Sequence, residues 1–319
     1  IGTEGGSIGF GIKENNFLGN GIQFDSNFTV SSETFKGKFS VTNPNFKNSD
    51  KSVYTSIEAL ETDNFKTTGY KTKKTGFTIG TNFEYLDDLF LGVGNSNFYE
   101  RIETNETASE RQKKQAGNYW DTFLKLDFNY DKRNQKFQTS SGYRSFYSLD
   151  LPIISDTGTL KNYYNHSYYF NLFEKNISSL SIYLEAANSL NNKDIKLSER
   201  IKIPSRRLRG FESGKVGPKD GNDFIGGNYI STLNINTTVP KIFENSENLD
   251  VLFFLDAANI WGIDYDSSLD DGNKIRSSIG IGVDWFTVIG PMSFSLTETL
   301  SKNDSDITES FRFNIGTTF

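Results

Sequence analysis

The sequence has no cysteine, one methionine and one histidine among its 319 residues. Without cysteine, the chain can form neither a disulfide bond nor a thiolate metal site. A metal centre built from several histidines is excluded too, because His166 stands alone. Its setting, "NYYNHSYYF", alternates like a strand, so a strand-surface residue is favoured over a catalytic one.

Long hydrophobic runs are also absent, and no stretch approaches the roughly 20 apolar residues of a transmembrane helix. The chain opens "IGTEGGSIGF", without the basic start and apolar stretch of a secretory signal. Only 35% of residues are hydrophobic, or about 39% with Gly counted in place of Tyr, against roughly 45–50% in soluble domains on that scale. With 28 Phe and 15 Tyr the chain is nevertheless too aromatic for disorder. Its formal charge of −6 argues against a nucleic-acid partner.

Period-two alternation runs through the chain, whereas helical spacing is rare. In "IRSSIGIGVDW", residues 275–285, one face is apolar and the other polar or Gly. About fifteen such segments occur, each long enough for the roughly 9–11 residues that a tilted strand needs to cross a bilayer. Tight connections (15–21, 43–51, 84–88, 131–136, 173–176 and 288–291) alternate with longer ones (103–118, 188–228 and 262–274). This pattern predicts an all-β, up-and-down antiparallel transmembrane barrel.

A soluble β-sandwich or propeller is the alternative, since its strands alternate as well. Segments such as 21–32 and 68–85 exceed the usual 5–6 residues of a strand, and their polar faces are too small and charged for a packed interior. Aromatic residues also gather near the predicted strand ends, as in interfacial girdles. They are Tyr85, Tyr119, Trp120, Tyr130, Trp261, Trp285, Phe286 and Phe319.

No residue pattern predicts catalysis, a metal or a cofactor. Four aspartates (Asp264, Asp266, Asp270 and Asp271) lack the ordered ligands and terminal Glu of a calcium loop, so a solvated outer loop is favoured over a cation site. The Gly-x-Gly pairs at Gly9 and Gly280 lie within strands and open no helix, which disfavours phosphate binding. We therefore expect neither enzyme activity nor a cofactor.

One long loop stands out, because residues 206–229, "RRLRGFESGKVGPKDGNDFIGGNY", carry three of the chain's 34 cations within four residues. A loop of this length in a compact barrel is usually functional. Outside the barrel its arginines would meet anionic lipid headgroups. Inside the lumen, an arginine would need a buried acidic partner.

At this loop the sequence resembles the outer-membrane protein assembly factor family, the BamA-type barrels, and the likeness runs nearly end to end. Leu208, Arg209, Gly210 and Phe211 look like the family's loop-six signature. "FFLDAANIW" and "GIGVDWFTVIGPMSFSL" look like later strands and their turn, and "NNFLGNG" and "FSVTNPNF" match early turns.

The resemblance implies that the tip of loop six returns into the lumen, where Arg209 pairs with Asp256. Periodicity agrees, because Val251, Phe253 and Leu255 take the lipid face and leave Asp256 inward. The sequence departs from the family pattern at Asn234, where many members have Glu, at Gln138, where the family has Pro, and at Ala258, where it has Gly. At the first two positions we expect luminal contacts that differ from those of the family, within the same fold.

The family has sixteen strands, the even number usual in bacterial barrels. By that resemblance Ile1 and Gly2 are the tail of a largely truncated first strand, which leaves about fifteen complete strands in a single barrel domain over residues 1–319. A signal peptide and periplasmic POTRA repeats are expected upstream. The implied location is the Gram-negative outer membrane.

The resemblance implies a non-enzymatic assembly factor that folds other β-barrel proteins into the outer membrane through a lateral seam between its first and last strands. The C-terminal strand "SFRFNIGTTF" forms one wall of that seam, with Phe311, Phe313, Ile315 and Phe319 toward lipid. Gly316 either lets this strand kink or relieves crowding in the lumen. Implied partners are unfolded barrel clients, accessory assembly lipoproteins bound through the periplasmic region, and outer-membrane lipid with lipopolysaccharide. The alternatives are a two-partner secretion or translocation-and-assembly barrel of the same superfamily, and a passive porin-like channel.

Overall fold

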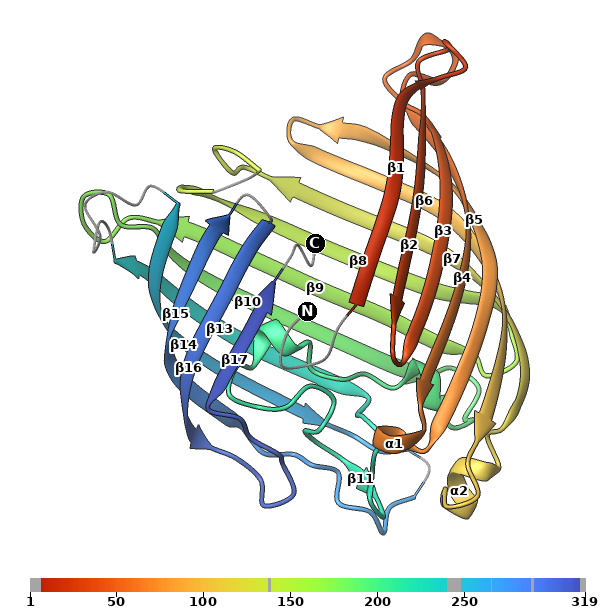
Figure 1. The fold of residues 1–319 in the computed structure, drawn as a ribbon. Coiled ribbons are helices and arrows are strands. Elements are labelled where there is room, and N and C mark those ends of the chain that lie inside the picture. The colour runs from red at the N-terminus through yellow and green to blue at the C-terminus, as the bar shows by residue number, and fades with distance from the viewer. Residues whose placement is uncertain (1–6, 137–138, 240–247, 265, 288–289, 316–319) are drawn as a thin grey trace.

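The alternating segments fold into strands of one antiparallel sheet in the computed structural model, which describes residues 7–136, 139–239, 248–264, 266–287 and 290–315 (Figure 1). Fifteen strands follow one another in chain order, each paired with its sequence neighbours. They are β1 (Ser7–Phe17), β2 (Ile22–Ser31), β3 (Thr34–Asn43), β4 (Ser52–Asn64), β5 (Tyr70–Leu86), β6 (Leu89–Thr104), β7 (Gly117–Asp131), β8 (Gly142–Ser155), β9 (Thr159–Phe170), β10 (Ser178–Ser189), β13 (Tyr229–Val239), β14 (Leu249–Trp261), β15 (Arg276–Thr287), β16 (Gly290–Ser301) and β17 (Phe311–Ile315). The predicted all-β, up-and-down fold with about fifteen complete strands is confirmed.

The remaining elements are short and belong to the connections. They are α1 (Phe65–Thr68), α2 (Glu110–Lys113), the 3₁₀ turns η1 (Phe46–Asn48), η2 (Leu197–Glu199) and η3 (Ser205–Arg207), and the hairpin of β11 (Lys219–Asp220) with β12 (Asp223–Phe224). None of the helices in the described residues is long and apolar enough to cross a membrane. In Figure 1, α1, α2 and β11 gather at one end of the sheet, and the turn between β1 and β2 projects from the other.

The two faces of the sheet differ in the way that the alternation predicts. Along β14 and β15 the apolar side chains of Phe253, Ile279 and Ile281 are nearly half exposed on the outer face. Asp256 and Ser278, on the inner face, are completely buried. A sheet of a soluble protein buries its apolar face and exposes its polar face. This sheet does the opposite, which is typical of a barrel whose outer face contacts lipid.

The edges of the sheet are β1 and β17. In the described part of the chain, β17 pairs with β16 over five residues, from Phe311↔Leu296 to Ile315↔Met292. Among the described residues no ladder joins β17 to β1, and the two strands lie apart in Figure 1. Each edge therefore presents backbone groups without a partner strand in the part of the chain that the structure describes.

Candidate functional site: loop 6 inside the lumen

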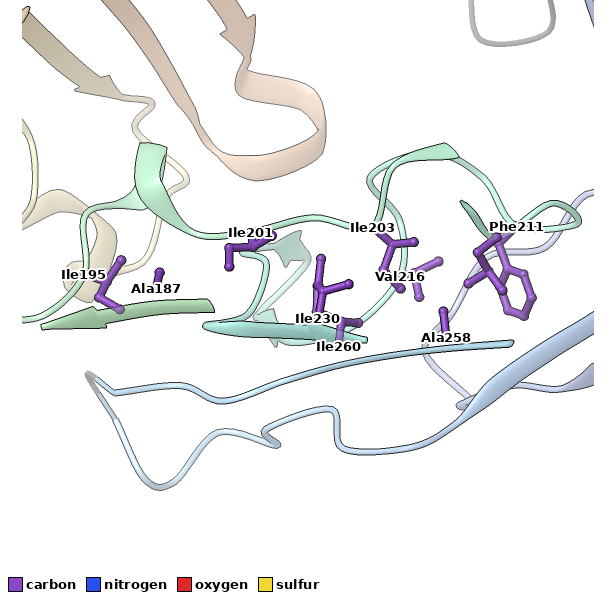
Figure 2. Packing of buried hydrophobic residues seen from close by; sticks show 10 residues of the cluster. Ala187, Ile195, Ile201, Ile203, Phe211, Val216, Ile230, Ala258 and Ile260 are labelled. Atoms are coloured by element: carbon purple, nitrogen blue, oxygen red, sulfur yellow. The ribbon is translucent and has the colours of Figure 1, made fainter. Parts of the chain in front are cut away.

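The long connection between β10 and β13, residues 190–228 and called loop 6 below, turns back against the inner wall of the sheet. Apolar side chains from the loop and from β10, β13 and β14 form one buried cluster (Figure 2). Its members are Ala187, Ile195, Ile201, Ile203, Leu208, Phe211, Val216, Ile230, Ala258 and Ile260. Since a fully buried aliphatic side chain contributes about 1.5–3 kcal/mol, this contact can hold the loop inside an otherwise polar lumen.

Arg209 and Asp256 form a two-bonded ion pair at the tip of the loop. Arg209 Nε donates to Asp256 Oδ2 and Nη2 donates to Oδ1, both at 2.7 Å. The backbone N–H of Arg209 adds a third bond to Oδ2 at 3.1 Å. The guanidinium also lies 3.5 Å from the ring centroid of Phe254, and Gly280 makes room for that ring because a Cβ there would lie 2.5 Å from it. The structure thus brings Arg209 and Asp256 together and satisfies the buried carboxylate.

Asn234 lies directly beside this pair. Its Nδ2 donates to Asp256 Oδ1 and to the carbonyl of Arg207, both at 2.8 Å. The register places Ser181, Asn234, Asp256, Ser278 and Thr299 opposite one another in a row across five strands of the inner wall. Ser278 Oγ donates to the carbonyl of Arg209 at 2.6 Å, so the loop tip is anchored along this row.

The other residues of the Leu208–Phe211 signature have steric roles. Leu208 and Phe211 are almost fully buried in the apolar cluster. Gly210 has a φ of +87°, and a Cβ at this position would lie 2.5 Å from Thr297 Cγ2. Only glycine fits this left-handed conformation so close to β16.

Loop 6 is also bonded to the segment that leads into the last strand. Glu309 N donates to Gly210 O at 3.0 Å, and Glu212 N donates to Ile307 O at 2.9 Å. Arg312, on the inner face of β17, donates to the carbonyls of Phe211 at 2.6 Å and Ser205 at 3.0 Å. Sequence reasoning missed this role of Arg312, although a cation at an inward position of the strand was a signal.

The expected outward residues of β17 are described only in part. Phe311 is 45% exposed and Phe313 is half-buried. Ile315 closes the ladder with β16, but its side chain lies outside the described part of the structure. Gly316, Phe319 and the family departure at Gln138 also lie outside the described residues, so the expectations for them stay predictions.

Buried ion pairs tie loop 6 to the wall on the side away from β17. Lys196 Nζ lies 3.0 Å from Glu100 Oε2 and 2.5 Å from Asp121 Oδ2, with all three side chains nearly inaccessible. Burial alone would raise the pKa of Glu199, but the positive charges of Lys161 and Lys196 outweigh it and hold that pKa below its usual value. Because these partners come from distant segments, no local sequence pattern could reveal them.

Arg276 and Asp306 form a second completely buried pair, with Arg276 Nε 2.9 Å from Asp306 Oδ2. Asp306 Oδ1 accepts a bond from the backbone N–H of Gly217 at 3.1 Å, and Arg276 donates to the carbonyls of Gly272 and Lys274, both at 2.7 Å. This pair therefore joins loop 6 to the connections before β15 and β17.

The aspartates of the connection before β15 are not all free in solvent. Asp264 pairs with Arg200, and Asp266 pairs with Arg111. Among the residues that the structure describes, no group of three or more acidic or histidine side chains is arranged to hold a metal ion. His166 lies on β9 and shares a hydrogen bond of 2.8 Å with Ser145 Oγ.

Comparison with known proteins identifies the family. The model of the Omp85 superfamily domain matches residues 16–319. A curated relative, the outer membrane protein assembly factor BamA of Neorickettsia risticii, is 24% identical over 257 residues, which cover 78% of this chain but only 34% of that protein. The chain thus spans about a third of the length of this relative.

Solved structures agree on the fold. The crystal structure of BamA from Haemophilus ducreyi lacking POTRA domains 1-3 is similar with a TM-score of 0.87 and 24% identity, covering 98% of this chain and 67% of that one. CdiB from Acinetobacter baumannii is similar with a TM-score of 0.60 and 10% identity. The match covers 98% of this chain and 56% of the CdiB chain. The chain belongs to the Omp85 superfamily and is a β-barrel of the Gram-negative outer membrane.

Proposed function

We propose that this barrel belongs to an outer-membrane protein assembly factor, which folds and inserts client β-barrel proteins at a seam between its first and last strands. The observation that carries the proposal is the edge strand β17, which in the described part of the chain pairs with β16 over five residue pairs and with no second strand. An edge strand is a template to which an incoming strand can add by backbone hydrogen bonds. Strand addition of this kind forms no covalent bond, so the proposed activity requires neither a nucleotide nor a catalytic side chain.

Two observations favour assembly over the alternatives. The fold is closer to BamA than to CdiB, with TM-scores of 0.87 and 0.60, which disfavours the secretion sibling. Loop 6 lies inside the lumen on a buried apolar cluster, which disfavours an open, passive channel. On this proposal the clients are unfolded outer-membrane barrels, and accessory lipoproteins bind the periplasmic region expected upstream. Lipid and lipopolysaccharide surround the outer face.

Reconstitution of the full-length protein into liposomes tests the activity. We expect faster folding of an added client barrel than in protein-free liposomes of the same lipid. If the protein conducts solute but leaves the rate of client folding unchanged, the assembly function is wrong. Export of a secreted domain without any effect on barrel insertion would instead support the secretion alternative.

Site-specific cross-linking tests the seam. A photoreactive residue at Phe311 of β17, which is exposed, should capture a client during insertion. The same residue at Phe77 of β5, which is equally exposed but far from either edge in the strand order, is the matched control. Equal capture at both positions would contradict growth at the seam.

A further inference from the structure

A pocket beneath loop 6 gathers half of the chain's arginines. Its volume is about 340 Å³, and the lining residues come from the β7–β8 turn, from β8, β9, β10 and β13, and from loop 6. Five of the ten arginines in the sequence line it, namely Arg133, Arg144, Arg206, Arg207 and Arg209. The other lining residues are Asn, Ser and Tyr, and none of the described lining residues is acidic. A chain with a net charge of −6 therefore concentrates positive charge in one luminal cavity.

Only two of these guanidinium groups have a carboxylate partner. Arg133 pairs with Asp131, and Arg209 pairs with Asp256. Arg144 donates to the amide oxygen of Asn129 at 2.7 Å.

The two neighbouring arginines of loop 6 lack a carboxylate partner as well. Arg207 donates to the amide oxygens of Asn165 at 2.8 Å and Asn234 at 3.4 Å. Within the described part of the chain, Arg206 has no hydrogen-bond or ion-pair partner. Three of the pocket's positive charges thus form no ion pair with a carboxylate among the described residues, and amide oxygens orient two of them.

We propose that this pocket binds a phosphate-class anion. Guanidinium groups bond phosphate oxygens through two parallel N–H donors, and the groups here reach one cavity from a turn, a strand and a loop. A tetrahedral oxyanion has acceptor oxygens that point in several directions, so it can accept from arginines on different sides of the pocket. A carboxylate has only two oxygens, both in one plane. The volume lies at the small end of the range for small-molecule pockets, which suits a compact anion better than a polypeptide segment.

The bound anion would join arginines of loop 6 to arginines of the wall. Arg206 and Arg207 belong to loop 6, while Arg133 and Arg144 belong to the wall around β8. The Arg209–Asp256 pair fixes the loop to β14, on another part of the wall. An anion between the two groups of arginines therefore adds a link from the loop to β8 and to the turn before it. It is either a free phosphate or the phosphate of a lipid or glycolipid headgroup.

Two variants of the full-length protein in detergent test the site by titration calorimetry with pyrophosphate at constant ionic strength. Asn165→Asp places a carboxylate oxygen where the amide oxygen accepts from Arg207, so it supplies internal compensation with almost no change in shape. Arg206→Gln removes a cation that makes no hydrogen bond or ion pair within the described residues. We expect each change to weaken pyrophosphate binding about tenfold, the loss of one charge-assisted contact.

Arg101→Gln, which removes an exposed charge on β6 outside the pocket, is the matched control and should leave the affinity unchanged. Absence of pyrophosphate binding to the wild type, or equal affinity in all variants, would overturn the proposal. So would binding of a glutamate-rich peptide without binding of pyrophosphate, because the ligand would then be a polypeptide.

Lipid nanodiscs distinguish the two sources of phosphate. If pyrophosphate binds equally in discs with and without phosphatidylglycerol, the free anion is the ligand. If phosphatidylglycerol or lipopolysaccharide competes with pyrophosphate, the headgroup phosphate occupies the pocket. Both results support the site, and both are independent of whether the protein assembles client barrels.

Discussion

Asp256 accepts four hydrogen bonds inside the lumen, three from Arg209 and one from Asn234. Periodicity alone predicted that Asp256 points inward, and the resemblance supplied Arg209 as its partner. The contributions of Asn234, Phe254 and Gly280 could not be predicted, because they depend on the register between strands. For single residues, the sequence indicates which side chains are polar and point inward. Which of these side chains contact one another is known only from the structure.

Removing either member of the Arg209–Asp256 pair leaves an uncompensated charge in the lumen. We expect Arg209→Ala and Asp256→Ala each to destabilise the docking of loop 6 by ~3–5 kcal/mol. Hydrogen exchange at residues 205–212 of the full-length protein measures the docking, and thermal unfolding measures the stability of the barrel. Lys215→Ala, which breaks an exposed ion pair in the same loop, is the control and should cost about 1 kcal/mol or less. Wild-type stability and growth complementation in both alanine variants would contradict the pairing.

Gly210 is constrained both by its backbone conformation and by its distance from β16. We expect Gly210→Ala to destabilise loop docking by ~1–3 kcal/mol, since an added Cβ is strained at positive φ and meets Thr297 Cγ2. Thr297→Ser, which removes that methyl group, should restore part of the loss when combined with Gly210→Ala. If the double variant is no more stable than Gly210→Ala alone, the contact with Thr297 does not cause the destabilisation.

At the scale of elements, the strands and the loops differ in how far the sequence reveals them. The strands were predictable, because each one turns apolar side chains to the outside and polar ones to the lumen. The docking of loop 6 was not, since Lys196 reaches Glu100 across 96 residues of sequence. The bond between loop 6 and β17 was missed for the same reason, as Arg312 lies 101 residues from Phe211.

Arg312 connects β17 to loop 6 through the carbonyls of Phe211 and Ser205. We expect Arg312→Gln to increase hydrogen exchange along β17 at least several-fold, because the charge-assisted bonds to Phe211, Ser205 and Glu309 are lost from an edge strand. Exchange along β9, in the middle of the sheet, should stay unchanged. If exchange rises equally in both strands, the change acts on the whole barrel instead of on the link between loop 6 and the edge strand.

For the whole molecule, the buried cluster around Lys196 makes stability depend on pH. The pKa of Glu199 is lower in the folded protein than its ordinary 4.5, because Lys161 and Lys196 outweigh the effect of burial. The stabilisation is therefore fully present above about pH 4.5 and is lost as the pH falls through the lower folded value, since the unfolded chain binds more protons. Thermal unfolding between pH 7 and pH 3 measures this loss. The loss of thermal stability per pH unit should be smaller in Glu199→Gln than in the wild type. If the loss is equal in both proteins, other carboxylates cause the pH dependence.

The odd number of strands has a geometric consequence at this largest scale. In an antiparallel sheet that follows chain order, neighbouring strands alternate in direction, so the first and the fifteenth point the same way. β1 and β17 could therefore pair with each other only as parallel strands. One additional strand running the opposite way would be antiparallel to both edges at once, whichever polypeptide supplies it. Parity thus lets any single antiparallel strand bridge both edges of the sheet that the structure describes.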